Sequence, residues 1–549
     1  MNFVYSRQGL RGGERVLQRF LEVIPGVMSW TLVIGFIVTA FWQPVIASIF
    51  VILFMLSWVM RLFYYLIFLM LSYARLRYEK DTDWLSRMRE LDRLPDAATE
   101  EPGRSSTAKG WGARLSCWSY RQDLREIRRR EAFPPPSSDI YHLVLIPVIK
   151  ESREVIEGNL SGLLRNRDLL KRMVVAIALE SRAPAEVKDA VRALKREYSG
   201  RFLDLLVVEH PDGLPGEARV KGANASHAAK AAGEFFRAKS IPFENVIVSC
   251  FDADTVVGPD YFACLTYTFM ACPDRYRASF QPIPVYHNNI WKVPGFARVV
   301  ETGSSFFQLV EMTNPEKLVT FSSHSMSFRA LVDVGYWPPD MISDDSGIFW
   351  KAYLHFDGDY RVVPIPVTIS MDVVDAGSWW RTCLSLYKQK RRWAWGVENF
   401  PLVLRGFLRN KKIPLYDKCR HAFKLLEGHV TWAALPFLLT FVGWLPAILS
   451  GREFSNTVLY FHSGRVTQTI FSLSSLVVLG TVILSTRLLP PKRKKFNLFW
   501  NVIHSLEWLL VPVILLFLSA LPALDAQTRL MSGRYMEFWV SDKRRSKTS

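Results

Sequence analysis

The chain has 549 residues, of which 49% are hydrophobic, and it carries a formal net charge of +18. This length exceeds that of one ordinary soluble domain, and the basic balance indicates anionic partners such as lipid headgroups, nucleotide phosphates or nucleic acid. The six cysteines show neither a CxxC pair nor zinc-ligand spacing with histidine, which argues against a structural zinc site.

The first apolar region lies between residues 27 and 71 and is interrupted near Pro44. It is long enough for two helices that each cross a bilayer, so we expect a membrane hairpin turning at Pro44, within an N-terminal unit at 1–74. Arg61 lies inside the second half of this region. It has either a functional role facing a protein interior or a snorkelling role at the membrane surface.

Residues 75–138 form a segment rich in Arg, Glu, Asp and Ser that ends in three prolines. We expect a cytosolic linker that is partly helical. Its arginine run, from Arg125 to Arg130, suits contact with anionic headgroups, although a solvated helix face is the simpler interpretation.

Short apolar runs alternate with helical patterns between residues 139 and 402. We expect strands at Leu143–Ile146, Met173–Leu179, Phe202–Val208 and Val246–Phe251, and helices at Ala185–Tyr198 and Ala223–Phe236. This alternation predicts an α/β domain with a mostly parallel sheet covered on both faces. Ligands of such sheets bind at the carboxyl ends of the strands.

Hydrophobic segments return after this domain. Residues 403–429 mix cationic and apolar side chains and suit an interfacial helix. Residues 430–526 contain two to three segments long enough to span a membrane, and residues 527–549 form a basic tail. The chain therefore combines an α/β domain with α-helical transmembrane regions on both sides.

Two basic runs, at 492–495 and 543–545, both favour the cytosolic side. A single full span over 500–521 would place them on opposite sides of the membrane. Pro512 and Pro522 allow this segment to be re-entrant or interfacial instead, and the sequence leaves both topologies open. Under either, the central domain is expected to be cytosolic.

Two carboxylates, Asp252 and Asp254, follow the apolar run that begins at 246–248. At a strand end both acids can turn toward one cation, and Mg²⁺ or Mn²⁺ prefers oxygen ligands shared with substrate phosphates. Acid pairs at loop starts also serve as turns or helix caps, so this motif alone is weak.

A second acid pair, Asp344 and Asp345, lies about ninety residues downstream. One of its members is suited to act as a general base toward an acceptor hydroxyl. Alternatively, Asp344 caps the helix that is expected at Ile348–Leu354.

The sequence Gln-Lys-Arg-Arg-Trp at 389–393 places Gln389, Arg392 and Trp393 on adjoining faces of a helix. The guanidinium suits a pyrophosphate and the indole suits a sugar face. A basic interfacial helix with aromatic anchors is the competing interpretation.

The order of these three motifs between membrane segments resembles the family 2 glycosyltransferases, above all membrane-integrated synthases of the cellulose, chitin and hyaluronan kind. The resemblance covers roughly residues 141–401. It implies a GT-A fold, which is Rossmann-like with a mostly parallel sheet. It also implies inverting transfer of a sugar from a nucleotide-diphosphate donor to a polysaccharide acceptor. Processive synthesis of a polymer is compatible with this resemblance.

The resemblance also implies roles for the motif residues. Asp345, with Asp344 beside it, is the catalytic acid pair. Asp254 and Asp252 hold a divalent cation, Mg²⁺ or Mn²⁺. The donor contacts Asp252, Gln389 and Arg392, and Trp393 forms the acceptor platform.

Further donor-binding positions follow from the family pattern: Pro147, Glu151, Glu180 and Lys221. Lys150 stands where the family usually has asparagine and Glu180 where it has aspartate, which leaves the nucleobase open. His324 is unusual in the acceptor loop and is either a contact to sugar or phosphate or a structural histidine.

Other functions remain to be weighed. The acceptor is either a glycan or a membrane lipid or lipid-linked sugar. A non-catalytic transporter or receptor would not need intact carboxylates at all three acidic positions. Nucleic-acid binding is not expected, because the basic runs flank membrane segments. We expect an integral protein of a bacterial plasma membrane.

Overall fold

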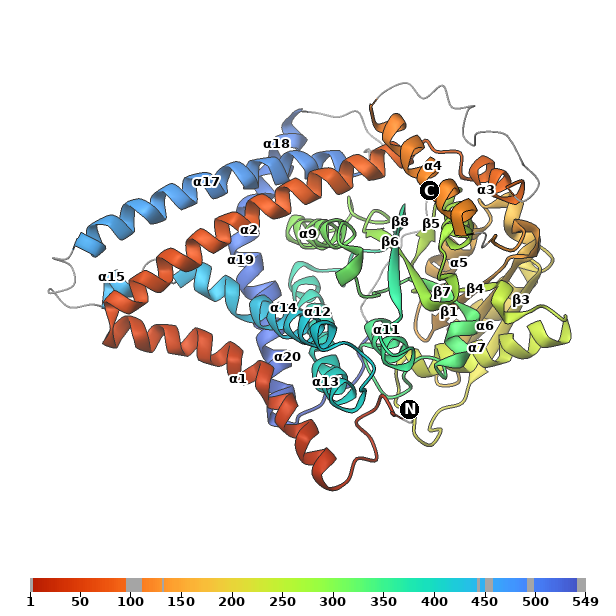
Figure 1. Ribbon diagram of the computed structural model, residues 1–549, viewed down its shortest axis with the longest axis horizontal. Coiled ribbons are helices and arrows are strands. Elements are labelled where there is room, and N and C mark those ends of the chain that lie inside the picture. The colour runs from red at the N-terminus through yellow and green to blue at the C-terminus, as the bar shows by residue number, and fades with distance from the viewer. Residues whose placement is uncertain are drawn as a thin grey trace.

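The computed structural model describes residues 3–94, 111–130, 133–441, 445–449, 458–490 and 498–540. An α/β body lies at one side of the molecule, and long helices extend away from it (Figure 1). The basic runs at 492–495 and 543–545, on which the topology argument rests, lie outside the described residues.

Eight strands form one mixed sheet in the order β3-β2-β1-β4-β7-β6-β8-β5. Their bounds are β1 Tyr141–Val148, β2 Met173–Glu180, β3 Asp204–His210, β4 Val246–Cys250, β5 Val256–Val257, β6 Ala278–Val285, β7 Ser325–Ser327 and β8 Arg361–Ser370. Strands β1 to β4 are parallel, which confirms the predicted parallel sheet. β3 begins and ends two residues later than the expected Phe202–Val208. Its side chains are only partly buried.

Antiparallel pairing in the second half of the sheet was not expected from the sequence. β7 runs antiparallel to both β4 and β6, and β5 antiparallel to β8. β7 has only three residues, so it shows too little apolar periodicity to be recognised in the sequence. This short strand places the 321–324 loop beside the end of β4.

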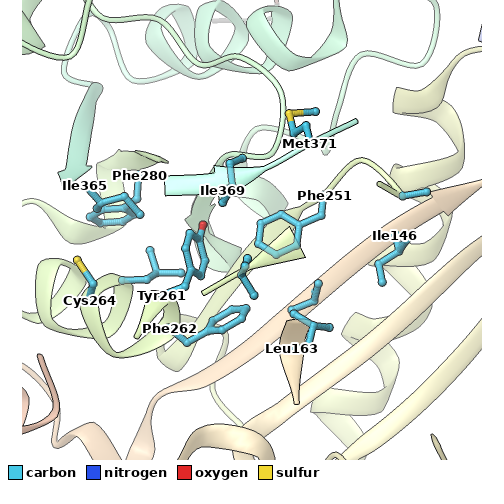
Figure 2. Close-up of a cluster of buried hydrophobic side chains, with 14 of the residues drawn as sticks. Ile146, Leu163, Phe251, Tyr261, Phe262, Cys264, Phe280, Ile365, Ile369 and Met371 are labelled. Atoms are coloured by element: carbon cyan, nitrogen blue, oxygen red, sulfur yellow. The ribbon is translucent and has the colours of Figure 1, made fainter. Parts of the chain in front are cut away.

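The helices of the body are α3 Trp84–Asp92, α4 Trp111–Arg130, α5 Arg153–Leu163, α6 Ala185–Tyr198, α7 Lys221–Ala238, α8 Tyr261–Ala271, α9 Gly295–Glu311, α10 Phe328–Asp333, α11 Asp344–His355, α12 Trp379–Ala394 and α13 Asn399–Arg409. Alternate side chains of β1 face opposite cores: Leu143 and Leu145 pack with α7, whereas Val144 and Ile146 pack with α5 and α8. Figure 2 shows Ile146 in this second core, together with Phe251 and Tyr261.

Four helical stretches among the described residues are long and apolar enough to cross a membrane: Gly12–Trp42, Pro44–Glu79, Gln468–Leu488 and Val502–Met531. The first two are α1 and α2, which meet at Gln43, next to the expected turn at Pro44. The third lies in α17 (Val458–Leu488), which packs along α2 (Figure 1).

The last span is irregular. It contains α18 (Leu498–Glu507) in part, a 3₁₀ turn at Trp508–Leu510, α19 (Val511–Ile514), a π-helical turn at Leu515–Ala520, and α20 (Leu521–Ser532). These interruptions lie close to the two prolines noted in the sequence, which remove backbone donors from a helix.

The expected interfacial helix is the first part of a longer one. α14 runs without a break from Leu415 to Phe441, and α15 (Leu445–Leu449) follows. Arg61 on α2 forms an ion pair with Glu427 on α14, with a nitrogen–oxygen distance of 2.7 Å. This pair joins the N-terminal hairpin to the C-terminal helices.

Candidate functional site

Both predicted acid pairs meet at the first residue of α7. Lys221 Nζ lies 2.8 Å from Asp252 Oδ1 and 2.9 Å from Asp345 Oδ1. Asp252 follows β4, and Asp345 lies in the first turn of α11. Since β4 pairs in parallel with β1, Asp252 lies at the carboxyl edge of these strands, and the packing of α11 against the start of α7 brings Asp345 to the same place. Positions that are about ninety residues apart in sequence are therefore bridged by one ammonium group.

Two serines fix the orientation of Asp252. The Ser322 hydroxyl donates a hydrogen bond of 2.6 Å to Asp252 Oδ2, and the backbone N–H of Asp252 donates to Ser323 Oγ at 3.2 Å. Ser323 adopts a positive φ of 63°, which turns the loop toward the strand end. The small residues of this loop suggested a place near the acceptor. The hydrogen bonds to Asp252 could not be predicted from the sequence.

Asp254 lies deeper than Asp252 and is 1% exposed. Its Oδ2 accepts a hydrogen bond of 2.8 Å from the backbone N–H of Asp372, which follows β8. The two acids of the first motif thus have different surroundings, with Asp252 open to the site and Asp254 anchored to the sheet.

Asp344 does not cap α11, because that helix already begins at Asp344 with Ser343 preceding it. Its side chain is buried, and burial together with the charge of Asp345 raises the pKa of Asp344 well above its usual range. A Cβ added at Gly222 would lie 2.9 Å from Asp344 Cβ and 2.7 Å from the Pro338 carbonyl oxygen. The glycine is therefore what lets Asp344 approach the start of α7.

His324 lies beneath the acid pair and is completely buried. Its Nδ1 lies 3.1 Å from the Phe321 carbonyl oxygen and 3.9 Å from Asp345 Oδ1. Burial lowers the pKa of His324 to about 4, so the ring is neutral at physiological pH. Of the two roles considered for it, this position favours a structural one.

The predicted nucleotide-binding residues lie at the carboxyl ends of β1 and β2. Glu151 Oε2 accepts hydrogen bonds from the backbone N–H groups of Ile149 and Lys150, at 2.7 and 3.0 Å, and so shapes the turn after Pro147. Glu180, at the end of β2, is buried and lies 3.3 Å from Arg182 Nε. Both acids are thus occupied within the protein.

A histidine that the sequence did not single out joins this group. His210 ends β3 directly opposite Glu180, with its Nδ1 3.5 Å from Glu180 Oε2. Its Nε2 lies 2.8 Å from Glu217 Oε2, in the loop that leads to Lys221. Only the strand register revealed this contact.

α12 carries the third motif toward the site. Gln389 is buried and Arg392 and Trp393 are half-buried. The positive charge of Arg392 acts on Asp344, where it opposes the rise in that carboxyl's pKa. Tyr286, which follows β6, lies with its ring centroid 6.4 Å from that of Trp393. Residues of all three motifs therefore lie around one region of the sheet edge.

The C-terminal segment also reaches this region, although its composition indicated only a basic tail. Arg392 Cζ lies 5.2 Å from the Phe538 ring centroid. Lys150 Nζ donates to the Val540 carbonyl oxygen at 2.8 Å and lies 5.7 Å from the Trp539 ring. The aromatic residues that precede the basic run at 543–545 could have indicated a packed C-terminal segment. No spacing in the sequence, however, predicts their contact with α12.

This fold and its acid-lined sheet edge define an α/β enzyme domain set among membrane helices. The sequence matches the family described as "Glycosyl transferase family group 2" over residues 247–521, half of the chain. The protein belongs to this family and is a membrane-embedded glycosyltransferase with a GT-A-like catalytic sheet.

Among curated proteins, the chain is similar to poly-beta-1,6-N-acetyl-D-glucosamine synthase of Staphylococcus aureus, with 31% identity over 175 residues. The match covers 31% of this chain and 39% of the relative. The synthase of the same name from Staphylococcus epidermidis is 29% identical over 175 residues, with the same coverage. The chain thus spans about two fifths of the length of these relatives.

Two solved structures align with lower similarity. The mannosyltransferase PcManGT from Pyrobaculum calidifontis, in complex with GDP-Man and Mn²⁺, is 16% identical with a TM-score of 0.39, and the alignment covers 68% of this chain and 97% of that chain. TarS from Staphylococcus aureus, in complex with UDP-GlcNAc, is 12% identical with a TM-score of 0.33, covering 73% and 95%.

Proposed function

We propose that this protein extends a polysaccharide by transferring a sugar from a nucleotide-diphosphate donor, with inversion at the anomeric carbon. N-acetylglucosamine is the first sugar to test, because the curated relatives are named as synthases of its polymer. The observation that carries the proposal is the contact of Lys221 with both Asp252 and Asp345. It joins the residues expected to bind the donor to the residue expected to act as base.

Asp345 is the general base in this proposal. Its side chain is 23% exposed, so an acceptor hydroxyl has access to it, whereas Asp344 is enclosed. The raised pKa of Asp344 favours its protonated form, which lowers the negative charge beside Asp345. Asp345 takes the proton as the hydroxyl attacks the anomeric carbon from the face opposite the leaving diphosphate.

Lys221 and Arg392 are the cations that face the leaving group. Lys221 pairs with Asp252 and Asp345 while the donor is absent, and an entering diphosphate competes for the same ammonium. Arg392 brings a second positive charge from α12, and Gln389 adds a buried amide beside it. Such preorganised donors stabilise the charge that develops on a leaving diphosphate.

The chemistry of Asp252 and Asp254 fits a divalent cation, because carboxylate oxygens are the ligands that Mg²⁺ and Mn²⁺ prefer. Within the described residues, no group of three or more His, Cys, Asp or Glu side chains is arranged to hold a metal by itself. A cation bound by one or two carboxylates normally completes its shell with substrate phosphates and water. When bound, the cation neutralises charge on the diphosphate.

We further place the catalytic domain on the cytosolic side of a bacterial plasma membrane, where nucleotide sugars are made. The four membrane-length helices anchor it there. The acceptor is then the polymer itself, and Trp393 forms the platform on which its terminal sugar stacks.

Substitution of the base tests this mechanism. Asp345→Asn keeps the size of the side chain but cannot accept the proton, so transfer is expected to fall at least about a hundredfold while donor binding persists. The measurement is incorporation of labelled sugar by purified protein, with nucleotide affinity from calorimetry as the control. Normal turnover by a folded Asp345→Asn protein would exclude Asp345 as the base.

A panel of UDP-N-acetylglucosamine, UDP-glucose and GDP-mannose, with and without Mn²⁺ or Mg²⁺, tests the substrate. Nucleotide release reports turnover, and the length of the product separates polymer synthesis from a single transfer to a lipid. A ladder of long products supports the polysaccharide acceptor, whereas one sugar per lipid supports the alternative. Release of no nucleotide from any donor would favour the non-catalytic interpretation.

A further inference from the structure

A buried ion pair lies directly behind the Trp393 platform. Lys390 of α12 and Glu301 of α9 are 5% and 0% exposed, and Lys390 Nζ lies 3.1 Å from Glu301 Oε2. The same ammonium donates to Ser304 Oγ at 2.8 Å, and Ser304 in turn donates to the Val300 carbonyl oxygen at 3.0 Å. The ammonium also lies 3.7 Å from the centroid of the Trp393 ring. We call these side chains, Glu301, Ser304 and Lys390, the α9–α12 cluster.

Stability alone does not account for this cluster. Removing two charges from water costs several kcal/mol per ion, and replacing a buried pair with apolar side chains is often neutral or stabilising. Glu301 Oε1 is buried without a hydrogen-bond partner, and so is Gln389 Oε1 on the neighbouring residue of α12. Unsatisfied buried oxygens add to that cost. Neither Glu301 nor Lys390 has a role in the proposed transfer reaction.

The geometry of the cluster acts on the indole of Trp393. Because Lys390 precedes Trp393 by three residues, both side chains project from one side of α12. The ammonium covers one face of the ring through a cation–π contact, and Glu301 holds the ammonium in place. An incoming sugar therefore has only the remaining surface of the indole, next to Tyr286, on which to stack.

We propose that the α9–α12 cluster is a positioning device for the acceptor: it fixes the plane of Trp393 and thereby the register of the terminal sugar against Asp345. The ligand class is a neutral or amino-sugar glycan end with free hydroxyls. This inference rests on the proposed glycosyltransferase function and concerns only the acceptor half of the site.

The test uses Lys390→Met, Lys390→Arg and the double variant Glu301→Leu/Lys390→Met in the full-length protein. The acceptor probe is a short β-1,6-linked N-acetylglucosamine oligosaccharide. Lys390→Met is expected to raise the KM for this acceptor about tenfold, which corresponds to about 1.4 kcal/mol, while the donor KM changes less than twofold. Lys390→Arg keeps a cation over the ring and is expected to recover most of the effect.

The double variant separates positioning from stability. It removes both charges, so it is expected to melt at or above the temperature of the wild type and still to show the raised acceptor KM. A double variant with the wild-type acceptor KM would overturn the inference. So would a change of donor and acceptor KM by the same factor in all variants. Nucleotide release with the acceptor present in excess is measured in parallel, and its absence in the wild type would instead reject the proposed function, and this inference with it.

Discussion

At the scale of single residues, the two members of the second acid pair have different surroundings although they are adjacent in sequence. Asp345 contacts Lys221 and is partly exposed, whereas Asp344 is 2% exposed and lies against Gly222. Helix geometry explains the difference, because consecutive residues project about 100° apart and only one can face Lys221 and the solvent. The sequence identified the pair, and burial distinguishes its members.

The raised pKa of Asp344 predicts a dependence of stability on pH. The folded state holds the proton more tightly than the unfolded state, so the free energy of unfolding falls as pH rises through the interval between the two pKa values. Asp344→Asn mimics the protonated acid and is expected to flatten this decline between about pH 5 and 8. Thermal melts of both proteins in detergent measure it. A wild-type stability that rises over this range, with a parallel curve for the variant, would contradict the prediction.

At the scale of elements, the start of α7 organises the site. Lys221 is its first residue. Gly222, in the first turn, leaves room for the Asp344 side chain and the Pro338 carbonyl oxygen. The sequence predicted α7 from Ala223 onward, two residues short of its observed start, because glycine and lysine give no apolar periodicity. The boundary of this helix, rather than its existence, is what the tertiary contacts decided.

Gly222→Ala is expected to destabilise the protein by about 1–3 kcal/mol, because the new methyl group overpacks against backbone and Asp344. Gly233→Ala on the same helix is the matched control. Its Cβ would meet its nearest atom, in Phe328, at 3.6 Å, and alanine favours a helix over glycine by up to about 1 kcal/mol. Melting temperatures of the two variants test the contrast. A Gly222→Ala protein that is as stable as the wild type would show that the start of α7 tolerates a methyl group.

At the scale of the whole molecule, the first helix, α1, packs against the last, α20. Arg19 of α1 donates to the carbonyl oxygens of Leu530 and Met531 of α20, at 2.9 and 2.8 Å. Tyr535 donates to Glu22 at 2.8 Å, and Arg7 Cζ lies 3.7 Å from the Tyr535 ring centroid. The N-terminal hairpin is therefore part of the scaffold that carries the C-terminal segment to the site.

A glycine sets the approach of these two helices. A Cβ at Gly26 would lie 2.9 Å from Met531 Cβ and 3.0 Å from the Gln527 carbonyl oxygen, as at other close helix contacts in membranes. Gly26→Leu is expected to separate α1 from α20 and to lower stability by about 1–3 kcal/mol. Gly35→Leu, on the same helix and near only Thr31 of its own chain segment, is the control. Detergent melts and nucleotide release are the measurements, and wild-type values for Gly26→Leu would refute the packing role.

The sequence by itself determined the class of this protein. Apolar runs marked the membrane hairpin and the parallel strands, since burial on both faces of a sheet or inside a bilayer leaves a continuous apolar signal. The order of the motifs identified the family. The tertiary structure alone decided which groups meet, because such contacts depend on strand register and helix packing rather than on local sequence. The Lys221 bridge, the buried Asp344 and the α9–α12 cluster behind Trp393 all arise in this way.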